Sequence, residues 1–200
     1  MMDTTATDTI TELKQKIKSK QIKFGVLGLG YVGLPLACEF AAIGVDVLGF
    51  DISDEKVTSI NKGISYIQDI QDDEIQSAVE KRKLKATTNM SLLSSVDVIS
   101  ICVPTPLRKT KDPDMSYIFS AIESVKAQLR KDHIIILEST TYPGTTEEVI
   151  LPKLEETGLR VGKDFYLAFS PERVDPGNKT YKTHNTPKVL GGVTSTCTEL

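Results

Sequence analysis

Three glycines with a spacing that suits phosphate binding follow the first apolar segment of the chain. Gly28, Gly30 and Gly33 form the pattern G-x-G-x-x-G, between a short apolar run and a longer one. In this pattern the first glycine permits a tight turn, the second lets the backbone approach a pyrophosphate, and the third lets a helix pack closely on a strand. The pyrophosphate would lie at the N–H groups that open the helix. The spacing therefore predicts a dinucleotide site, with a structural turn that binds no phosphate as the alternative.

A carboxylate follows at the position where such a site needs one. Asp51 ends the next apolar run, roughly 20 residues after Gly28, and an acid at this offset accepts hydrogen bonds from a ribose hydroxyl. Ile52 and Ser53 come next instead of an arginine. Because a 2′-phosphate would meet the carboxylate without a compensating cation, the sequence predicts NAD and not NADP.

Strands and helices alternate along the chain around these residues. We expect strands near residues 23–28, 45–50, 84–87, 96–103, 133–138, 165–169 and 188–191, and helices near 31–43, 53–62, 72–82, 116–131 and 145–156. Several strands are apolar throughout, which is typical of parallel strands buried on both faces. The pattern predicts an α/β fold, a Rossmann-like doubly wound, mainly parallel sheet with helices on both faces. An amphipathic helix near residues 9–20 lies in an N-terminal extension, residues 1–22, ahead of the Rossmann domain, residues 23–200.

The loops that follow the strands are rich in proline, glycine and hydroxyl groups, and ligands of doubly wound folds bind at this edge of the sheet. The segment 103–106 is either a rigid strand exit or a cofactor contact. Ser139 and Thr140 either face the ligand or cap the helix that begins near Thr145. Glu172, in a turn bracketed by prolines, is either a functional carboxylate or a solvated loop acid.

Composition excludes several other classes of protein. The 200 residues are 40% hydrophobic with a formal net charge of −3, so no broad basic surface for nucleic acid is expected. No apolar stretch approaches the roughly 20 residues that span a bilayer, and the polar first residues lack a signal-peptide core. We expect a cytoplasmic location without membrane contact. The three cysteines, Cys38, Cys102 and Cys197, and two scattered histidines predict neither disulfides nor a metal site.

Taken together, these segments resemble the N-terminal, NAD-binding part of the UDP-glucose/GDP-mannose dehydrogenase family. The resemblance runs from about Lys23 to the end of the chain. It rests on the motifs at 28–35, 50–51, 103–106, 138–144, 170–173 and 189–192. Within the family, the motifs at 61–67, 113–117 and 170–178 look most like the UDP-N-acetylglucosamine 6-dehydrogenase branch.

The resemblance implies an enzyme that oxidises the C6 alcohol of a UDP-hexose to the carboxylate with two NAD, through a cysteine-bound thiohemiacetal and thioester. Glu172 would then serve acid/base work and hydrolysis, and Thr140 would position water and reacting groups. By the same resemblance the residues that contact the cofactor are Gly28, Gly30, Tyr31, Val32, Gly33, Asp51, Ile52, Lys56, Val103, Pro104, Thr105, Ser139, Thr140 and Glu172. A homo-oligomer is also implied for the whole enzyme.

The family's nucleophilic cysteine, its catalytic lysine and asparagine and its uridine-binding domain would all lie beyond residue 200. None of the three cysteines of this chain stands in the family's G-x-C-x-x-K-D context. We therefore expect a truncated chain that is inactive alone. The alternatives are a stand-alone NAD-binding or sensing module without catalysis, and a 3-hydroxyacid dehydrogenase, which leaves the Ser-Pro-Glu-Arg segment at 170–173 unexplained.

Overall fold

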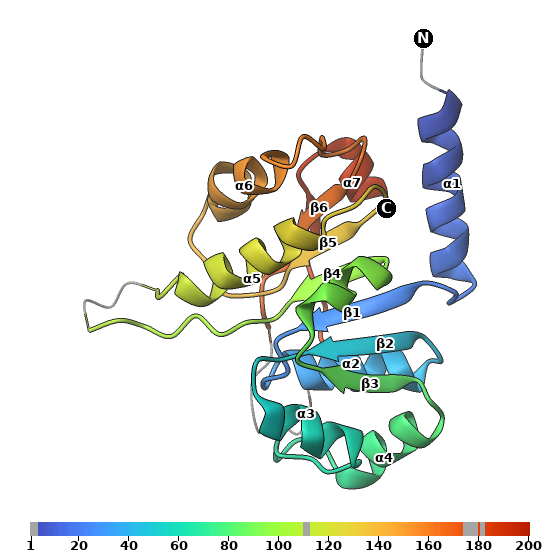
Figure 1. Ribbon diagram of the computed structural model, residues 1–200, viewed down its shortest axis with the longest axis vertical. Coiled ribbons are helices and arrows are strands. Elements are labelled where there is room, and N and C mark those ends of the chain that lie inside the picture. The colour runs from blue at the N-terminus through green and yellow to red at the C-terminus, as the bar shows by residue number, and fades with distance from the viewer. Residues whose placement is uncertain (1–3, 110–112, 174–179, 181–182) are drawn as a thin grey trace.

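One twisted sheet organises the computed structural model, which describes residues 4–109, 113–173, 180 and 183–200 (Figure 1). The strand order is β3-β2-β1-β4-β5-β6-β7. The strands are β1 (Lys23–Leu27), β2 (Asp46–Phe50), β3 (Leu84–Thr87), β4 (Val98–Ile101), β5 (Ile134–Leu137), β6 (Tyr166–Phe169) and β7 (Gly191–Gly192). Each neighbouring pair is parallel except β6 and β7, which are antiparallel.

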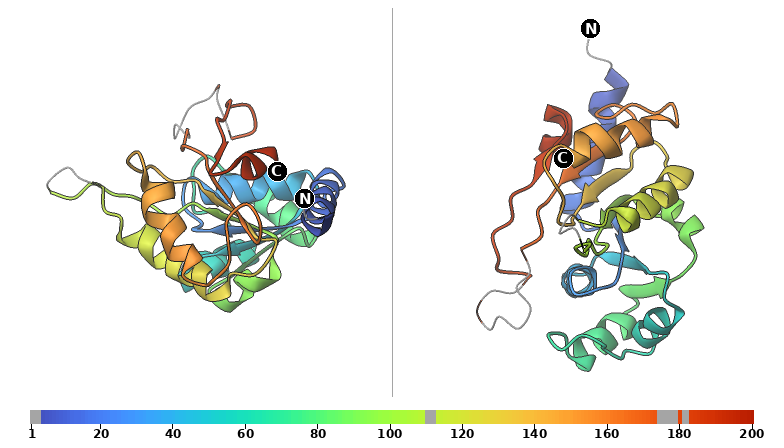
Figure 2. Two further views of the ribbon diagram at one scale, coloured as in Figure 1. Left: turned by 90° about the horizontal axis from the view of Figure 1, so that it is seen from above. Right: turned by 90° about the vertical axis from the view of Figure 1, so that its left-hand side faces the viewer.

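Helices cover both faces of this sheet (Figure 2). They are α1 (Thr4–Lys18), α2 (Gly33–Ala42), α3 (Asp54–Asn61), α4 (Asp72–Glu80), η1 (Met90–Ser95), α5 (Ser116–Gln128), η2 (Thr145–Ile150), α6 (Leu151–Glu155) and α7 (Ser195–Glu199). One core joins the sheet to α2, α3 and α4, together with single residues of α1 and α7. A second core joins it to η1, α5 and α6. The prediction of a doubly wound, mainly parallel α/β fold is confirmed.

The helix expected at 145–156 is divided into two parts. Residues 145–150 form a π-helix and only Leu151–Glu155 is α-helical. Pro152 lacks the N–H that would bond to the carbonyl four residues earlier, and its ring would crowd that carbonyl. The last strand is also shorter than expected and begins later, at Gly191, and the 3₁₀-helix η1 was not predicted.

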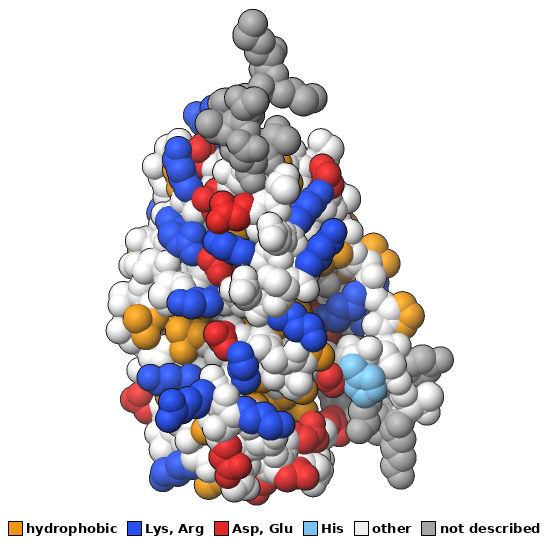
Figure 3. All heavy atoms as spheres, turned by 90° about the vertical axis from the view of Figure 1, so that its right-hand side faces the viewer, with side chains coloured by type: hydrophobic (Ala, Val, Ile, Leu, Met, Phe, Trp, Pro, Cys, Tyr) orange, Lys and Arg blue, Asp and Glu red, His pale blue; other side chains and the backbone are white. Residues whose placement is uncertain are grey.

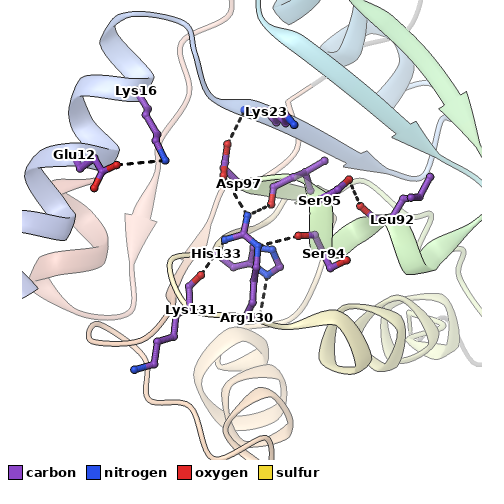
Figure 4. Close-up of polar contacts among 11 residues, drawn as sticks. Glu12, Lys16, Lys23, Leu92, Ser94, Ser95, Asp97, Arg130, Lys131 and His133 are labelled. Carbon is purple, nitrogen blue, oxygen red and sulfur yellow. Dashed lines mark hydrogen bonds and ion pairs between the residues drawn. The ribbon is translucent and has the colours of Figure 1, made fainter.

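A polar cluster lies at the amino ends of the central strands β1, β4 and β5 (Figure 4). The Arg130 guanidinium donates to the Val96 carbonyl at 2.6 Å and to the Asp97 carboxylate at 3.2 Å. Asp97 also accepts the Lys23 N–H at 2.9 Å. His133 is fully buried beside them, and burial, followed by the charge of Arg130, lowers its pKa to about 4. These contacts tie together the start of β1 and the segments that precede β4 and β5.

Acidic and basic side chains are intermixed on the face of the molecule shown in Figure 3. Among the described residues, no helix combines the length and the apolar character needed to cross a bilayer. In the same part of the chain, no group of three or more His, Cys, Asp or Glu side chains is placed to hold a metal ion.

Candidate cofactor site

The strand order places a topological switch point between β1 and β4. These strands are neighbours, yet the segments that follow them cover opposite faces of the sheet, and ligands of doubly wound folds bind at such a switch point. The glycine loop follows β1, and Cys102 and Val103 follow β4. A Cβ placed on Gly28 would lie 2.7 Å from the Cys102 carbonyl oxygen, so the two strand exits are in contact.

The three glycines of the loop differ in what surrounds them. Gly28 has a φ of +97°, a conformation that side chains disfavour. A Cβ on Gly33 would lie 1.9 Å from the Gly28 carbonyl oxygen, so any side chain there would separate α2 from the loop. A Cβ on Gly30 would meet nothing within 4 Å. Gly30 is thus the glycine that faces open space, where a pyrophosphate would approach the backbone.

The N-terminus of α2 supplies donors at the same place. Its first i→i−4 bond runs from the Leu34 N–H to the Gly30 carbonyl at 3.0 Å. The N–H groups of Tyr31, Val32 and Gly33 therefore precede the first intrahelical bond, as the opening N–H groups of a helix do. They are positioned to bind an anion, which the helix dipole also favours.

Asp51 is buried next to this loop, with 7% of its surface exposed. Its Oδ2 accepts the Leu29 N–H at 2.9 Å and the Lys56 ammonium at 3.2 Å, and its Oδ1 accepts the Ser53 N–H at 3.0 Å. Since a carboxylate oxygen has two lone pairs, Oδ1 has acceptor capacity for a ribose hydroxyl. Asp51 therefore holds the glycine loop through the Leu29 N–H, a role that the sequence did not predict.

The remaining predicted contact residues differ in their exposure to solvent. Ile52 is 83% exposed and Tyr31 is 55% exposed, so both offer apolar surface to a ligand. Val103 and Thr105 are half-buried and Pro104 is exposed. Ser139 is 2% exposed, and its hydroxyl contacts the carbonyls of Ile101 and Val103 at 3.1 and 2.9 Å. The Ser139 side chain thus joins the ends of β5 and β4 and does not cap a helix.

Thr140 and Glu172 line the same cavity, which has a volume of about 550 Å³. It lies between the exits of β5 and β6, and its wall consists of residues 140–147, Phe169 and residues 171–173. Glu172 Oε1 accepts the Arg173 N–H at 2.6 Å. Thr140 and Glu172, which the resemblance predicts to act together, therefore line one cavity. Of the motif at 170–178, residues 174–178 lie outside the described part of the chain.

A buried ion pair beneath this edge was not anticipated. Glu138 is 5% exposed, accepts the Ser100 hydroxyl at 3.1 Å and forms an ion pair with Lys188. Burial lowers the pKa of Lys188. A charged residue directly after the apolar strand β5 was the only signal for this pair, because a buried carboxylate needs a partner. The pair links the end of β5 to the segment that precedes β7.

The cysteines of the chain are buried in the core. Burial raises the pKa of the Cys38 and Cys102 thiols to about 12. A thiol is nucleophilic as its thiolate, so neither group is activated at neutral pH. This agrees with the interpretation of these two residues as structural.

Comparisons with known proteins agree with this geometry. Residues 22–200 match the model of the UDP-glucose/GDP-mannose dehydrogenase family, NAD binding domain. UDP-N-acetyl-D-glucosamine 6-dehydrogenase of Pseudomonas aeruginosa is 41% identical over 182 residues, and UDP-N-acetyl-D-mannosamine dehydrogenase of Pyrococcus horikoshii is 40% identical over 180 residues. Each alignment covers 90% of this chain, but only 42% and 43% of the respective relative.

A solved structure shows the same arrangement of elements. The NDP-N-acetyl-D-galactosaminuronic acid dehydrogenase from Methanosarcina mazei Go1 superposes with a TM-score of 0.82 at 34% identity, covering 94% of this chain and 42% of that one. The fold, the glycine loop with its aspartate, and the match over residues 22–200 lead to one conclusion. The chain belongs to the UDP-glucose/GDP-mannose dehydrogenase family and corresponds to its NAD-binding domain.

Proposed function

We propose that this chain is the cofactor-binding part of a UDP-sugar 6-dehydrogenase that oxidises the C6 alcohol of UDP-N-acetylglucosamine to the uronic acid. The observation that carries the proposal is the placement of Thr140 and Glu172 in one cavity, at the sheet edge that also holds the glycine loop. The 42% coverage of the Pseudomonas aeruginosa relative supports a longer protein as the active species.

The residues at the switch point between β1 and β4 would hold a dinucleotide. The N–H groups of Tyr31, Val32 and Gly33 would hold its pyrophosphate, and Asp51 Oδ1 would accept a ribose hydroxyl. The exposed side chain of Ile52 would cover the adenine. When bound, NAD would accept the hydride released from the sugar carbon.

Glu172 and Thr140 would act on protons and water at the reacting carbon. Alcohol oxidation releases a proton and hydrolysis of an acyl intermediate consumes water, so both steps need a positioned base. Both residues line one cavity, which supports a role of the Glu172 carboxylate as the base and of the Thr140 hydroxyl in orienting water.

The choice of sugar rests on sequence motifs. The segments at 61–67 and 113–117 favour UDP-N-acetylglucosamine. Overall sequence identity does not separate the two sugars, because the UDP-N-acetyl-D-glucosamine and UDP-N-acetyl-D-mannosamine enzymes are 41% and 40% identical to this chain. A direct comparison of kcat/KM on the two UDP-sugars, in a protein that extends beyond Leu200, tests this choice. A higher value for UDP-N-acetylmannosamine would contradict the proposed substrate.

The chain itself provides the first test. The 200-residue protein should bind NAD in calorimetry but produce no NADH when incubated with NAD and UDP-N-acetylglucosamine. We expect no turnover because the alignment covers only 42% of the Pseudomonas aeruginosa relative, and we propose that the groups that orient C6 belong to the part of that relative that this chain does not cover. Orientation contributes about 7–11 kcal/mol of barrier lowering. Steady NADH production that Cys102→Ser or Cys197→Ser abolishes would show that the chain has its own nucleophile and would refute the proposal.

The role of Glu172 is tested in the longer protein. Glu172→Gln should leave folding and NAD affinity nearly unchanged and lower kcat by about 100-fold or more, the scale of lost acid/base catalysis. Glu80→Gln, on the exposed end of α4, controls for the loss of one negative charge. A lower melting temperature with near-normal turnover would make Glu172 a structural loop acid.

A further inference from the structure

Leu29 lies between the first two glycines of the loop, and its side chain, N–H and carbonyl all contact residues outside the loop. Its side chain is fully buried and would lie 2.8 Å from a Cβ on Gly49 of β2. Its N–H donates to Asp51 Oδ2 at 2.9 Å, and its carbonyl accepts the Tyr66 hydroxyl at 2.6 Å. Both backbone polar groups of one loop residue are therefore fixed by side chains from outside the loop.

The two bonds define the orientation of the loop peptides. The Leu29 carbonyl and the Gly30 N–H belong to one planar trans peptide unit, so they point in opposite directions. A bond that fixes this carbonyl also fixes the direction of the Gly30 N–H. The Leu29 N–H belongs to the preceding peptide unit, which Asp51 fixes in the same way. Tyr66 therefore fixes the Leu29–Gly30 peptide and Asp51 fixes the Gly28–Leu29 peptide. A substitution of either side chain should change the orientation of a different peptide.

Tyr66 reaches the loop from a well-anchored segment between α3 and α4. Next to it, the Ser65 N–H donates to the Asp72 carboxylate at 2.7 Å, and the Ile67 N–H donates to the Ser65 hydroxyl at 3.1 Å. The Ile67 side chain is buried in the core. The segment that carries Tyr66 is therefore held in place by hydrogen bonds and core packing that do not involve the Tyr66 hydroxyl.

The electrostatic surroundings keep Tyr66 a hydrogen-bond donor. Burial, followed by the charge of Asp51, raises the pKa of the Tyr66 hydroxyl above its ordinary value. The Lys56 ammonium, which pairs with Asp51 at 3.2 Å, lies 6.0 Å from the centre of the Tyr66 ring. The hydroxyl thus stays protonated at neutral pH and donates to the carbonyl.

We propose that Tyr66 is a positioning residue for the pyrophosphate of the cofactor, because its hydroxyl holds the Leu29–Gly30 peptide in the binding orientation. This inference rests on the proposed cofactor site. Without the hydroxyl, the peptide populates other orientations, and the apparent affinity falls by the fraction of loops that remain competent. A single hydrogen bond of this kind shifts such a population by about three- to tenfold.

The test compares three ligands on the 200-residue chain by calorimetry. Tyr66→Phe should weaken NAD and ADP by the same factor, about three- to tenfold, because both carry the pyrophosphate. Adenosine, which lacks it, should bind the variant and the parent chain equally. Tyr117→Phe, an exposed tyrosine on α5, is the matched control and should change none of the three affinities.

A second variant separates the hydroxyl from the ring. Tyr66→Ala removes the packing of the ring as well and should lower the melting temperature more than Tyr66→Phe. If packing alone mattered, Phe would restore the ADP affinity that Ala loses. Restoration to within twofold of the parent chain would overturn the role of the hydroxyl. A parent chain that binds neither NAD nor ADP would instead overturn the cofactor site itself, so the two failures are distinguishable.

Discussion

Asp51→Asn tests two roles of this carboxylate: the support of the glycine loop that the structure shows and the proposed acceptance of a ribose hydroxyl. Asparagine has almost the same shape but one acceptor oxygen in place of two. If that oxygen takes the place of Oδ2, the amide NH₂ faces the Ser53 N–H. If it takes the place of Oδ1, the NH₂ faces the Leu29 N–H and the Lys56 ammonium. Either orientation leaves at least one backbone donor without its acceptor.

The magnitude follows from these contacts. A buried backbone donor that loses its acceptor costs about 1–3 kcal/mol. The Lys56 side chain is 38% exposed, so its ion pair adds no more than about 1 kcal/mol. The free energy of unfolding should fall by roughly 1–4 kcal/mol. For a chain of this size the melting temperature falls about 2–4 °C for each kcal/mol. Scanning calorimetry of the ligand-free protein measures this change.

Cofactor affinity should change in a direction that depends on the ligand. NAD loses a charge-assisted hydrogen bond to the ribose, about 1.5–3 kcal/mol or roughly 10- to 100-fold in Kd. NADP loses the repulsion between its 2′-phosphate and the carboxylate, and the Lys56 ammonium loses its anionic partner. The preference for NAD over NADP should therefore fall by at least about tenfold.

An exposed aspartate provides the control for Asp51→Asn. Asp54→Asn removes the same charge from an exposed position in the first turn of α3. It should leave the NAD to NADP ratio nearly unchanged. If Asp51→Asn leaves both the melting temperature and this ratio at the values of the parent chain, the carboxylate neither supports the loop nor selects the cofactor.

Two further predictions concern the glycine loop and the buried histidine. Gly33→Ala should abolish measurable NAD binding in calorimetry, because the added Cβ would lie 1.9 Å from the Gly28 carbonyl oxygen. Gly191→Ala, at a glycine of β7 whose φ is not positive and whose added Cβ would meet nothing within 4 Å, is the control and should keep NAD affinity. Near-normal binding by Gly33→Ala would contradict the packing argument. His133 has a pKa of about 4 in the fold against 6.5 as its ordinary value, so its contribution to stability is complete above pH 6.5 and is lost as the pH falls toward 4. Between pH 7 and pH 5 the free energy of unfolding should fall by about 2 kcal/mol from this effect. Urea unfolding should show this loss in the parent chain and not in His133→Asn. If the free energy of unfolding depends on pH in the same way in both proteins, His133 is not buried as a neutral group.

The amino-acid sequence determined the features that depend on short stretches of chain. Strand and helix alternation follows from the spacing of apolar residues, which is local, and the apolar strands indicated burial on both faces. The glycine spacing predicted the tight turn at Gly28 and the helix that begins at Gly33, because turn geometry and helix N-termini are also local properties. Strand ends in a parallel sheet share one edge, so the loops of the site could be expected together.

The tertiary structure decided which distant residues complete the site. Tyr66 and Leu29 are 37 positions apart, and Lys188 and Glu138 are 50 apart. Neither contact has a local signature, because it depends on how the helices pack on the sheet and where the chain returns to it. The same holds for Asp51, whose carboxylate was expected to face only a ligand and also holds the loop. A residue's type restricts what it can bond, but the partner that meets it in space is selected by the packing of the whole domain.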